Sequence, residues 1–414
     1  MTAWAGARPP VRVLTIVLVA LLTFAPRAAV PQAPATDPFQ VNQYTPDHQS
    51  WARVASSGDG SFVAVWRSSG GQDGDESGVF GRWYDGDCQP LSNEVQLNQY
   101  TTGQQYAPDV GVDASGRVVA VWRSSDQGLV GRRFLGPGPI DDEFVIEPAA
   151  AEPFGGGSVS VAAEGSFLAS WMTVEGTGRS VWTRGYEADG KPAGPRVRVT
   201  DQASSNDIAP AGLAPNGDYF VTWEQQETWP EVWGRRFVAA QGDFEPAFEV
   251  GPPLHGVFSY HPKIAADEEN SFRVVWREQI HLERSDVVSR ATGAGGLGPR
   301  VRLAEDTGEF AIDVTATGDF VVAYGDGQYA FDIKGRLGSR DNELRPPFEI
   351  ATSPYPYPSP ADLAVRGADA REFIVVWSQG AAGGQSDVFA RCFRRLFADG
   401  FESGDTSAWS QTVP

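Results

Sequence analysis

Cysteine, methionine and histidine are scarce in this 414-residue chain, and its basic residues are too few to balance its acidic ones. There are 2 Cys, 2 Met and 4 His, and 33 Lys and Arg face 53 Asp and Glu, which gives a formal net charge of −20. The sequence has no His-Glu-x-x-His and no Gly-x-Ser-x-Gly motif, so the usual zinc-protease and serine-hydrolase signatures are missing. A chain of this charge does not attract polyanions by its overall field, and we expect no nucleic-acid partner.

Long apolar runs are also missing after the first 25 residues. Arg8 and Arg12 precede the run Val13–Ala25, which is too short to span a bilayer and typical of a secretory signal. We therefore predict a signal peptide at residues 1–35, cleaved between about 25 and 35, with no transmembrane segment in the mature chain. The protein would be secreted, to the cell surface, the medium or a periplasm. A buried N-terminal helix is the alternative.

Glycine and proline are abundant, with 47 and 30 copies, which argues against a mostly helical protein. An apolar five-residue segment that ends in an aromatic residue recurs seven times along the chain. The final aromatic residues are Trp66, Trp122, Trp171, Trp223, Trp276, Tyr324 and Trp377. They lie 48 to 56 residues apart, and a period near 50 is typical of propeller blades.

Each repeat contains the signals of four strands. Six residues before the final aromatic stands a Gly or Asn in every repeat but the last, where Arg371 takes its place. Gly and Asn accept the positive φ of tight hairpin turns, so a first strand precedes each apolar segment. A third strand follows and carries an arginine in every repeat, namely Arg82, Arg132, Arg184, Arg235, Arg290, Arg336 and Arg391. We expect these arginines to be structural, stacking on aromatic rings and bonding carbonyl or acidic groups; a ring of anion ligands is the alternative.

The two ends of the repeat region complement each other. The chain opens with a lone fourth-type strand at Phe39–Asn42, and the last repeat stops at a third strand near Phe393. Pairing of these two segments would close a ring and protect its edges. The sequence thus predicts an all-β, seven-bladed propeller over residues 38–395, followed by a C-terminal tail at 396–414. Two packed β-sandwiches are the alternative.

The sequence of the repeats resembles that of large secreted bacterial repeat proteins of the adhesin type. The resemblance is clearest at Phe39–Thr45, Gly58–Trp66 and Gln72–Asp85, and it fades to the strand skeleton after the second repeat. Such proteins often carry calcium-binding nonapeptide arrays, but no such array occurs here. The resemblance therefore implies architecture and export more than activity.

An acidic loop in the first repeat is a candidate ion site. Asp73, Asp75 and Glu76 cluster on a glycine-rich connection, and carboxylate oxygens are the ligands that Ca²⁺ prefers. A hydrated acidic loop is the alternative. No other cofactor is indicated; His255 and His261, the only histidines close in sequence, could contribute to a metal site with other residues.

The two cysteines, Cys88 and Cys392, fall in the first and last repeats. These repeats are neighbours if the ring closes, and export to an oxidising compartment permits a disulfide. Whether the two sites come within reach is left open by the sequence.

One face of the predicted disc is richer in side chains for recognition. The longer connections are those from strand two to strand three and from strand four to the next blade. They lie on the same face of the disc, which we call the long-loop face. Its candidate ligand-binding residues are Tyr106, Trp229, Tyr260, Tyr329 and Tyr355. Exposed aromatic residues with polar neighbours suit carbohydrate or protein ligands. We therefore expect a monomeric, exported, non-enzymatic binding protein. The alternatives are a polysaccharide-active hydrolase or lyase, with carboxylates gathered at the channel mouth, and a structural module of the cell surface.

Overall fold

The computed structural model describes residues 32, 34–176, 178–203, 209–226, 229–251, 257–280, 284–293, 295–326, 332–352, 359–366, 370–380 and 384–394. The predicted C-terminal tail, and the predicted signal peptide except for residues 32, 34 and 35, lie outside these ranges. Within them, no helix is long and apolar enough to cross a membrane.

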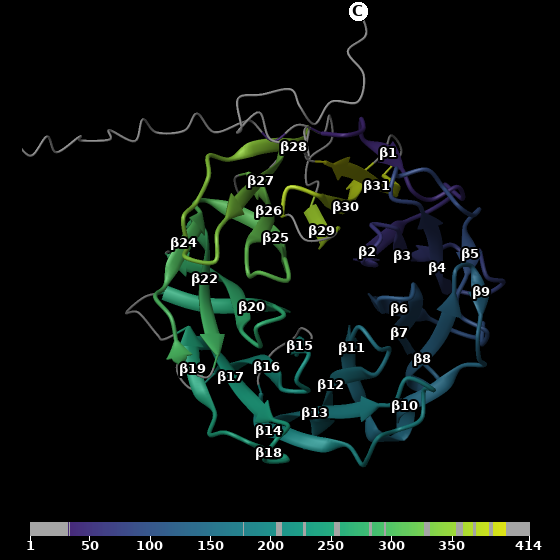
Figure 1. Cartoon of the computed structure of the whole chain (residues 1–414). Coiled ribbons are helices and arrows are strands. Elements are labelled where there is room, and N and C mark those ends of the chain that lie inside the picture. The colour runs from purple at the N-terminus through teal and green to yellow at the C-terminus, as the bar shows by residue number, and fades with distance from the viewer. Residues whose placement is uncertain are drawn as a thin grey trace, which may run out of the picture. The chain divides into compact units, whose positions relative to one another are not determined.

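The described residues form seven antiparallel sheets arranged as blades around a central channel (Figure 1). Blades 1 to 3 comprise β2 (Gln49–Ser56), β3 (Phe62–Ser69), β4 (Ser77–Tyr84), β5 (Val95–Gln96), β6 (Gln105–Val112), β7 (Arg117–Ser124), β8 (Gly128–Leu135), β9 (Gly138–Pro139), β10 (Phe144–Pro148), β11 (Pro153–Val161), β12 (Phe167–Glu175), β13 (Gly178–Tyr186) and β14 (Val197–Ala203). A short 3-10 turn, Ala149–Ala151, precedes β11.

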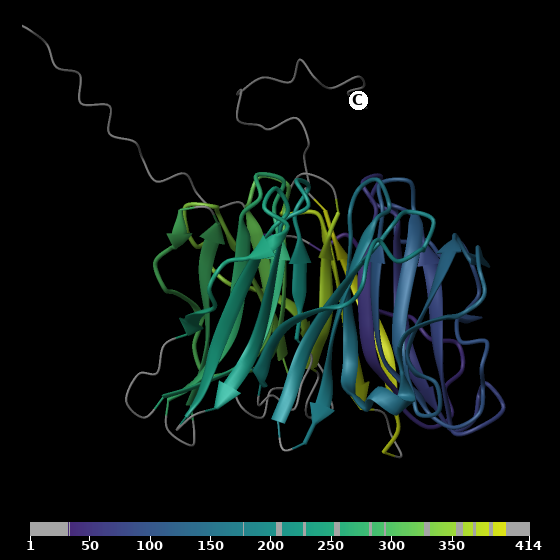
Figure 2. The same cartoon turned by 90° about the horizontal axis from the view of Figure 1, so that it is seen from below.

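Blades 4 to 7 repeat this plan. They comprise β15 (Ala211–Leu213), β16 (Tyr219–Gln226), β17 (Pro230–Val238), β18 (Asp243–Phe244), β19 (Phe248–Gly251), β20 (Val257–Ala266), β21 (Phe272–Ile280), β22 (Arg284–Gly293), β23 (Gly296–Leu297), β24 (Val301–Ala304), β25 (Thr307–Val314), β26 (Phe320–Asp326), β27 (Asp332–Gly338), β28 (Phe348–Thr352), β29 (Ser359–Val365), β30 (Phe373–Gly380) and β31 (Ser386–Phe393). In every blade the first strand is innermost and the strands run between the two faces of the disc (Figure 2). The predicted fold class is confirmed.

The ring closes through the N-terminal strand, as the sequence predicts. Strand β1 (Phe39–Gln40) pairs with β31 as the outer strand of blade 7, and Val41 N continues the ladder by donating to Val388 O at 2.8 Å. Upstream, Ala35 N donates to Cys392 O at 2.8 Å. The chain's first and last described segments thus share one sheet, which leaves no free edge at the closure.

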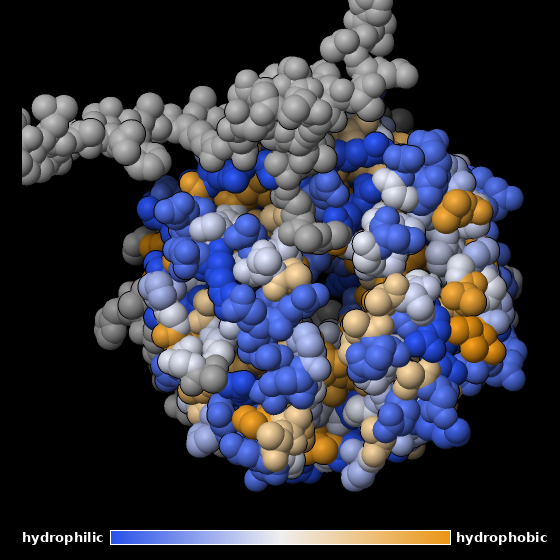
Figure 3. Space-filling model, viewed as in Figure 1, coloured by the Kyte–Doolittle hydropathy of each residue, from blue (hydrophilic) through white to orange (hydrophobic). Residues whose placement is uncertain are grey.

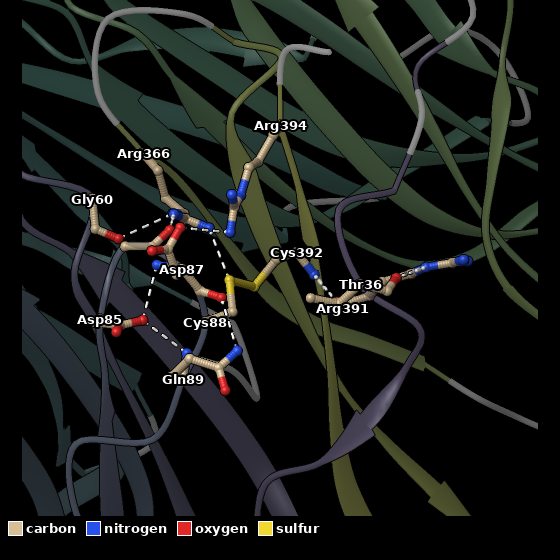
Figure 4. The surroundings of a disulfide bond; sticks show 11 residues. Thr36, Gly60, Asp85, Asp87, Cys88, Gln89, Arg366, Arg391, Cys392 and Arg394 are labelled. Atoms are coloured by element: carbon tan, nitrogen blue, oxygen red, sulfur yellow. Dashed lines mark hydrogen bonds and ion pairs between the residues drawn. A yellow bond between two sulfur atoms is a disulfide. The ribbon is translucent and has the colours of Figure 1, made fainter. Parts of the chain in front are cut away.

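A disulfide joins the same two blades. Cys88, in the connection after β4 of blade 1, is bonded to Cys392 on β31 of blade 7, across a sequence separation of 304. The buried Arg366 guanidinium lies beside it and donates to Gly60 O at 3.0 Å and, from Nη1, to the Cys88 sulfur at 3.0 Å (Figure 4). The pairing that the sequence left open is therefore formed, and it lies at the ring closure.

The hydrophobic core is divided among the blade-to-blade contacts. Seven clusters of buried apolar side chains occur in the described residues, one between each pair of neighbouring blades. The final aromatic residue of each repeat, from Trp66 to Trp377, is at most 5% exposed. Because both faces of each second strand are covered, these strands are apolar along their length instead of alternating.

The third-strand arginines lie between blades. Arg132 donates from Nε to Asp141 O at 2.9 Å in its own blade, and from Nη1 to Leu97 O at 3.1 Å on the outer side of the preceding blade. Matching bonds to the preceding blade are made by Arg82, Arg235, Arg290, Arg336 and Arg391, while Arg184 donates to Gly194 O at 3.0 Å. None of these arginines contributes to the lining of the central channel in the described part of the chain.

A repeated irregularity shapes the first strands. Between Ser50 and Arg53 the register of β2 shifts, and Trp51 has φ +55°. Ala107 in β6 and His261 in β20 occupy equivalent bulges, with φ +50° and +53°. A bulge turns a side chain away from its regular direction. In this protein it does so where the first strands begin, at the long-loop end of the channel.

Candidate functional site

The central channel is lined by the first strands and contains a cavity of about 400 Å³. Figure 3 shows the channel opening at the centre of the face viewed in Figure 1, with mostly hydrophilic residues around it. The charged residues that line the cavity are Arg53, Asp109, Lys263, His261, Glu309, Asp313 and Asp362. Four of these, Arg53, Asp109, Lys263 and Asp362, occupy the same register position in their blades, each opposite the residue before the final aromatic.

Three aspartates of the channel connect successive inner strands. Asp362 of blade 7 accepts a hydrogen bond from Val54 N of blade 1 at 3.1 Å, and Asp313 of blade 6 accepts one from Val365 N of blade 7 at 2.8 Å. Asp109 of blade 2 likewise accepts one from a backbone N–H of blade 3 at 2.8 Å. The carboxylates therefore help to hold the channel wall together while facing its interior.

Burial perturbs two of these carboxyl groups. Desolvation raises the pKa of Asp109 to about 6; Arg53, 3.8 Å away, opposes the rise and the charge of Asp362 adds to it. Desolvation also raises the pKa of Asp313 to about 7, although two backbone N–H groups oppose it. The side chain of Asp109 is still 17% exposed, because the channel admits water at its position. Burial in the channel wall thus brings the pKa of both carboxyl groups toward neutral pH.

At the long-loop end, aromatic rings and guanidinium groups alternate across blades 1 and 2. The Trp51 ring is 45% exposed and lies 5.7 Å from the Tyr106 ring of the next blade, between centroids. The Arg67 guanidinium lies 5.1 Å from the centroid of Trp51, and Arg123 is paired in register with Tyr106. We call Trp51, Arg67, Tyr106 and Arg123 the Trp51 cluster. It presents two aromatic rings, inclined to each other by 52°, with guanidinium groups beside them.

A second group lies in blades 5 and 6. Tyr260 precedes the bulged His261 in β20, its hydroxyl donates to Gln279 Oε1 at 2.8 Å, and its ring lies 4.4 Å from the guanidinium of Arg277. Glu309 of β25 approaches both His261 Nδ1, at 4.0 Å, and Arg277 Nη1, at 3.9 Å. Here the aromatic–arginine pair has a carboxylate beside it, unlike the Trp51 cluster.

The other predicted ligand-binding residues are dispersed. Trp229 is 43% exposed and packs edge-on against Phe258 of the next blade, with ring centroids 5.1 Å apart. Tyr329 and Tyr355 lie outside the described residues. The predicted ligand-binding residues thus include Tyr106 and Tyr260 of these two groups but not Trp51, Arg67 or the channel aspartates, and their role in binding stays a prediction. One sequence signal existed: an arginine directly follows the final Trp in repeats one, two and five.

The calcium site suggested for the acidic loop of blade 1 stays a prediction, and the structure shows how two of its three carboxylates are bonded within the protein. Asp73 Oδ2 accepts a hydrogen bond from Asn98 Nδ2 at 2.8 Å, and Asp75 Oδ2 accepts one from Gly103 N at 2.9 Å. Their oxygens therefore bond two different positions of the following connection instead of converging with Glu76. No group of three His, Cys, Asp or Glu side chains suited to a metal ion occurs in the described part of the chain, which includes this loop and His261.

Comparisons with known proteins bear on the fold alone. No protein-family model and no curated protein sequence matches the chain, so the adhesin-type resemblance gains no family assignment. Among solved structures, a protein of unknown function from Dyadobacter fermentans is similar with a TM-score of 0.53 and 9% identity, over 88% of this chain and 98% of that one. It supports the propeller architecture.

Two carbohydrate-active proteins are more distant. An α-L-arabinanase from Penicillium chrysogenum, complexed with arabinobiose, has a TM-score of 0.47 and 13% identity over 71% of this chain and 94% of that one. An ulvan lyase of polysaccharide lyase family 25 has a TM-score of 0.46 and 10% identity over 73% and 79%. A fold does not by itself define a function, so the function of this protein has to be argued from its site.

Proposed function

We propose that this protein is an extracytoplasmic, non-enzymatic propeller that binds a carbohydrate or protein ligand through its long-loop face, next to the channel mouth. The Trp51 cluster is the observation that carries the proposal. An indole ring that is 45% exposed, next to a second aromatic ring and two guanidinium groups, offers area for stacking and polar groups for orientation. Tyr260 and Trp229 would extend the surface toward blades 4 and 5.

The location rests on the disulfide and the sequence of the N-terminus. A disulfide persists in oxidising compartments and is rare in the cytosol, so the bond between Cys88 and Cys392 is consistent with export. The apolar run Val13–Ala25 provides the independent argument for a signal peptide.

The test is a glycan array followed by calorimetry on variants. For a carbohydrate ligand, Trp51→Ala and Tyr106→Ala should each weaken binding roughly fivefold, because one stacking contact contributes on the order of 1 kcal/mol. Leu135→Ala is the matched control, since Leu135 is an equally exposed apolar residue, 60% accessible, at the far end of β8 in blade 2. Binding that survives both aromatic substitutions, or that is lost in the Leu135 control, would place the site elsewhere.

A second candidate, a polysaccharide-active hydrolase, is favoured by the two carboxyl groups with raised pKa in one channel. Asp313, with a pKa of about 7, would be the general acid, and Asp109 or Asp362 its partner. Their hydrogen bonds to backbone N–H groups of neighbouring blades favour the structural role instead. A turnover screen on polysaccharides decides: activity that disappears in both Asp313→Asn and Asp109→Asn, with binding retained, would establish the enzyme.

A further inference from the structure

Arg67 and Arg123 occupy equivalent positions in blades 1 and 2. Both directly follow the buried final Trp of their repeats, Trp66 and Trp122, near the long-loop end of the second strand. Their Nε atoms are buried and have no hydrogen-bond partner, as is also true of Arg236, Arg277 and Arg290. Among the described residues the Arg67 guanidinium forms no hydrogen bond, whereas Arg123 donates from Nη1 to Ser124 O at 2.6 Å and also interacts with the Tyr106 hydroxyl.

Neither group has an acidic partner. Across the described ranges, no carboxylate oxygen lies within 4.0 Å of Arg67 or Arg123. Glu76 is close enough to raise the pKa of Arg67 but too far to form an ion pair. This is unexpected in a chain with a net charge of −20, where acids are the most abundant partners.

Blade 5 shows what the same position looks like when it is paired. Arg277 follows the buried Trp276, lies beside Tyr260, and has Glu309 of the next blade at 3.9 Å. In the blade that follows Arg67 the residue equivalent to Glu309 is Ala107, and in the blade that follows Arg123 this position falls in the glycine run 155–157. The protein thus supplies an anion from the next blade beside the arginine of blade 5, and supplies only small residues at the corresponding positions beside Arg67 and Arg123.

The two unpaired groups remain charged. Burial lowers the pKa of Arg67 and of Arg123, with Tyr106 opposing the shift in both, but a guanidinium is not deprotonated at neutral pH. A partly desolvated positive charge without a partner is unfavourable. An anion that approaches from solvent would remove this penalty and would gain charge-assisted hydrogen bonds.

We propose that the Trp51 cluster binds an acidic oligosaccharide, with its carboxylates on Arg67 and Arg123 and its sugar rings against Trp51 and Tyr106. This inference rests on the proposed function and names the ligand class of the same surface. The two guanidinium groups come from neighbouring blades and lie beside the Trp51–Tyr106 ring pair, an arrangement that suits a short polymer with more than one negative charge. A long polyanion would be repelled by the rest of the molecule, so the ligand is a short stretch or a chain end.

The test compares three trisaccharides by titration calorimetry with the purified, disulfide-bonded protein. The probes are trigalacturonate, its fully methyl-esterified form and a sulfated neutral trisaccharide. Salt is held at 0.15 M, where the Debye length of about 8 Å screens the overall charge. Trigalacturonate should bind at least tenfold more tightly than the methyl ester and more tightly than the sulfated probe.

Variants identify the residues. Arg67→Gln and Arg123→Gln should each weaken trigalacturonate binding on the order of tenfold, as expected for loss of a charge-assisted hydrogen bond, and leave methyl-ester binding unchanged. Arg67→Lys should lose part of the effect, since Lys keeps the charge without the planar fork. Arg302→Gln is the control, because Arg302 is on the outer strand β24 and its side chain is 46% exposed. Unchanged melting temperatures exclude misfolding.

The outcomes separate this inference from the proposed function. Equal binding of the acid and its ester, or tighter binding of the sulfated probe, overturns the carboxylate assignment. If none of the three probes binds but another ligand from the array is lost in Trp51→Ala, the inference fails and the proposed function stands. If no ligand depends on Trp51 or Tyr106, both fail. Equal binding of a glutamate tripeptide, unaffected by Trp51→Ala, overturns the sugar part.

Discussion

The covalent closure of the ring should be the largest single contribution to stability that can be removed without disturbing the blades. In the chain-entropy description, a cross-link across a separation of 304 residues restricts the unfolded chain by about 6 kcal/mol at 25 °C. For the roughly 330 residues that the structure describes, the unfolding entropy of about 2.1 cal/mol/K per residue converts this into a melting temperature lower by about 8–9 °C.

The surroundings of the two sulfur atoms determine which residue should replace each cysteine. Cys88 Sγ accepts a hydrogen bond from Arg366 Nη1 at 3.0 Å, and a serine oxygen could take this role, whereas Cys392 is fully buried among apolar side chains. The variant Cys88→Ser/Cys392→Ala therefore removes the bond with little other disturbance. Its melting temperature, measured by calorimetry, should equal that of the reduced wild-type protein, and thiol titration should find two free thiols only in the latter.

A refuting result is simple to recognise. If wild type, reduced wild type and the double variant melt within about 2 °C of one another, the bond does not restrict the unfolded state as the entropy model requires. Retained structure in the unfolded chain would then be the better account of this closure.

Three further predictions concern the architecture. Deleting residues 38–42 should lower the melting temperature and expose the edge of β31 to aggregation, as checked by light scattering, because it removes the outer strand of blade 7. Arg132→Ala should cost about 2–3 kcal/mol in urea unfolding, since it removes two hydrogen bonds between partly buried groups; no loss would refute the structural role of these arginines. Asp313 has a folded-state pKa of about 7, above its unfolded value, so its contribution is fully present below pH 4 and is lost as pH rises through 7. Asp313→Asn should therefore gain stability relative to wild type as pH increases from 4 to 8, and a constant difference would contradict the shift.

The sequence predicted the fold well at positions where every repeat meets the same physical requirement. A second strand covered on both faces must be apolar throughout, so the final aromatic residues revealed seven blades, and the missing fourth strand of the last repeat revealed the closure. The disulfide stayed open because reach between Cys88 and Cys392 depends on how the connection after β4 turns. The hairpin turns show a further limit of the sequence: Asp218, in the turn between β15 and β16, is only 3% exposed and forms an ion pair with Arg236 at 2.5 Å.

The candidate site could not be predicted from the sequence, because it consists of positions at which the repeats differ. Trp51, Ala107, His261 and Glu309 share one bulged position but not one chemistry, and nothing in the text of a single repeat indicates that the bulge turns Trp51 toward solvent. Arg67 and Arg123 each directly follow the final Trp of a repeat, so in the sequence they look like part of the structural repeat. Only the three-dimensional ring brings these guanidinium groups, which have no acidic partner, next to Trp51 and Tyr106, whereas in blade 5 Glu309 lies 3.9 Å from Arg277. In a propeller, a binding site is expected where structurally equivalent positions of the blades carry different residue types. Binding experiments should therefore begin with blades 1 and 2.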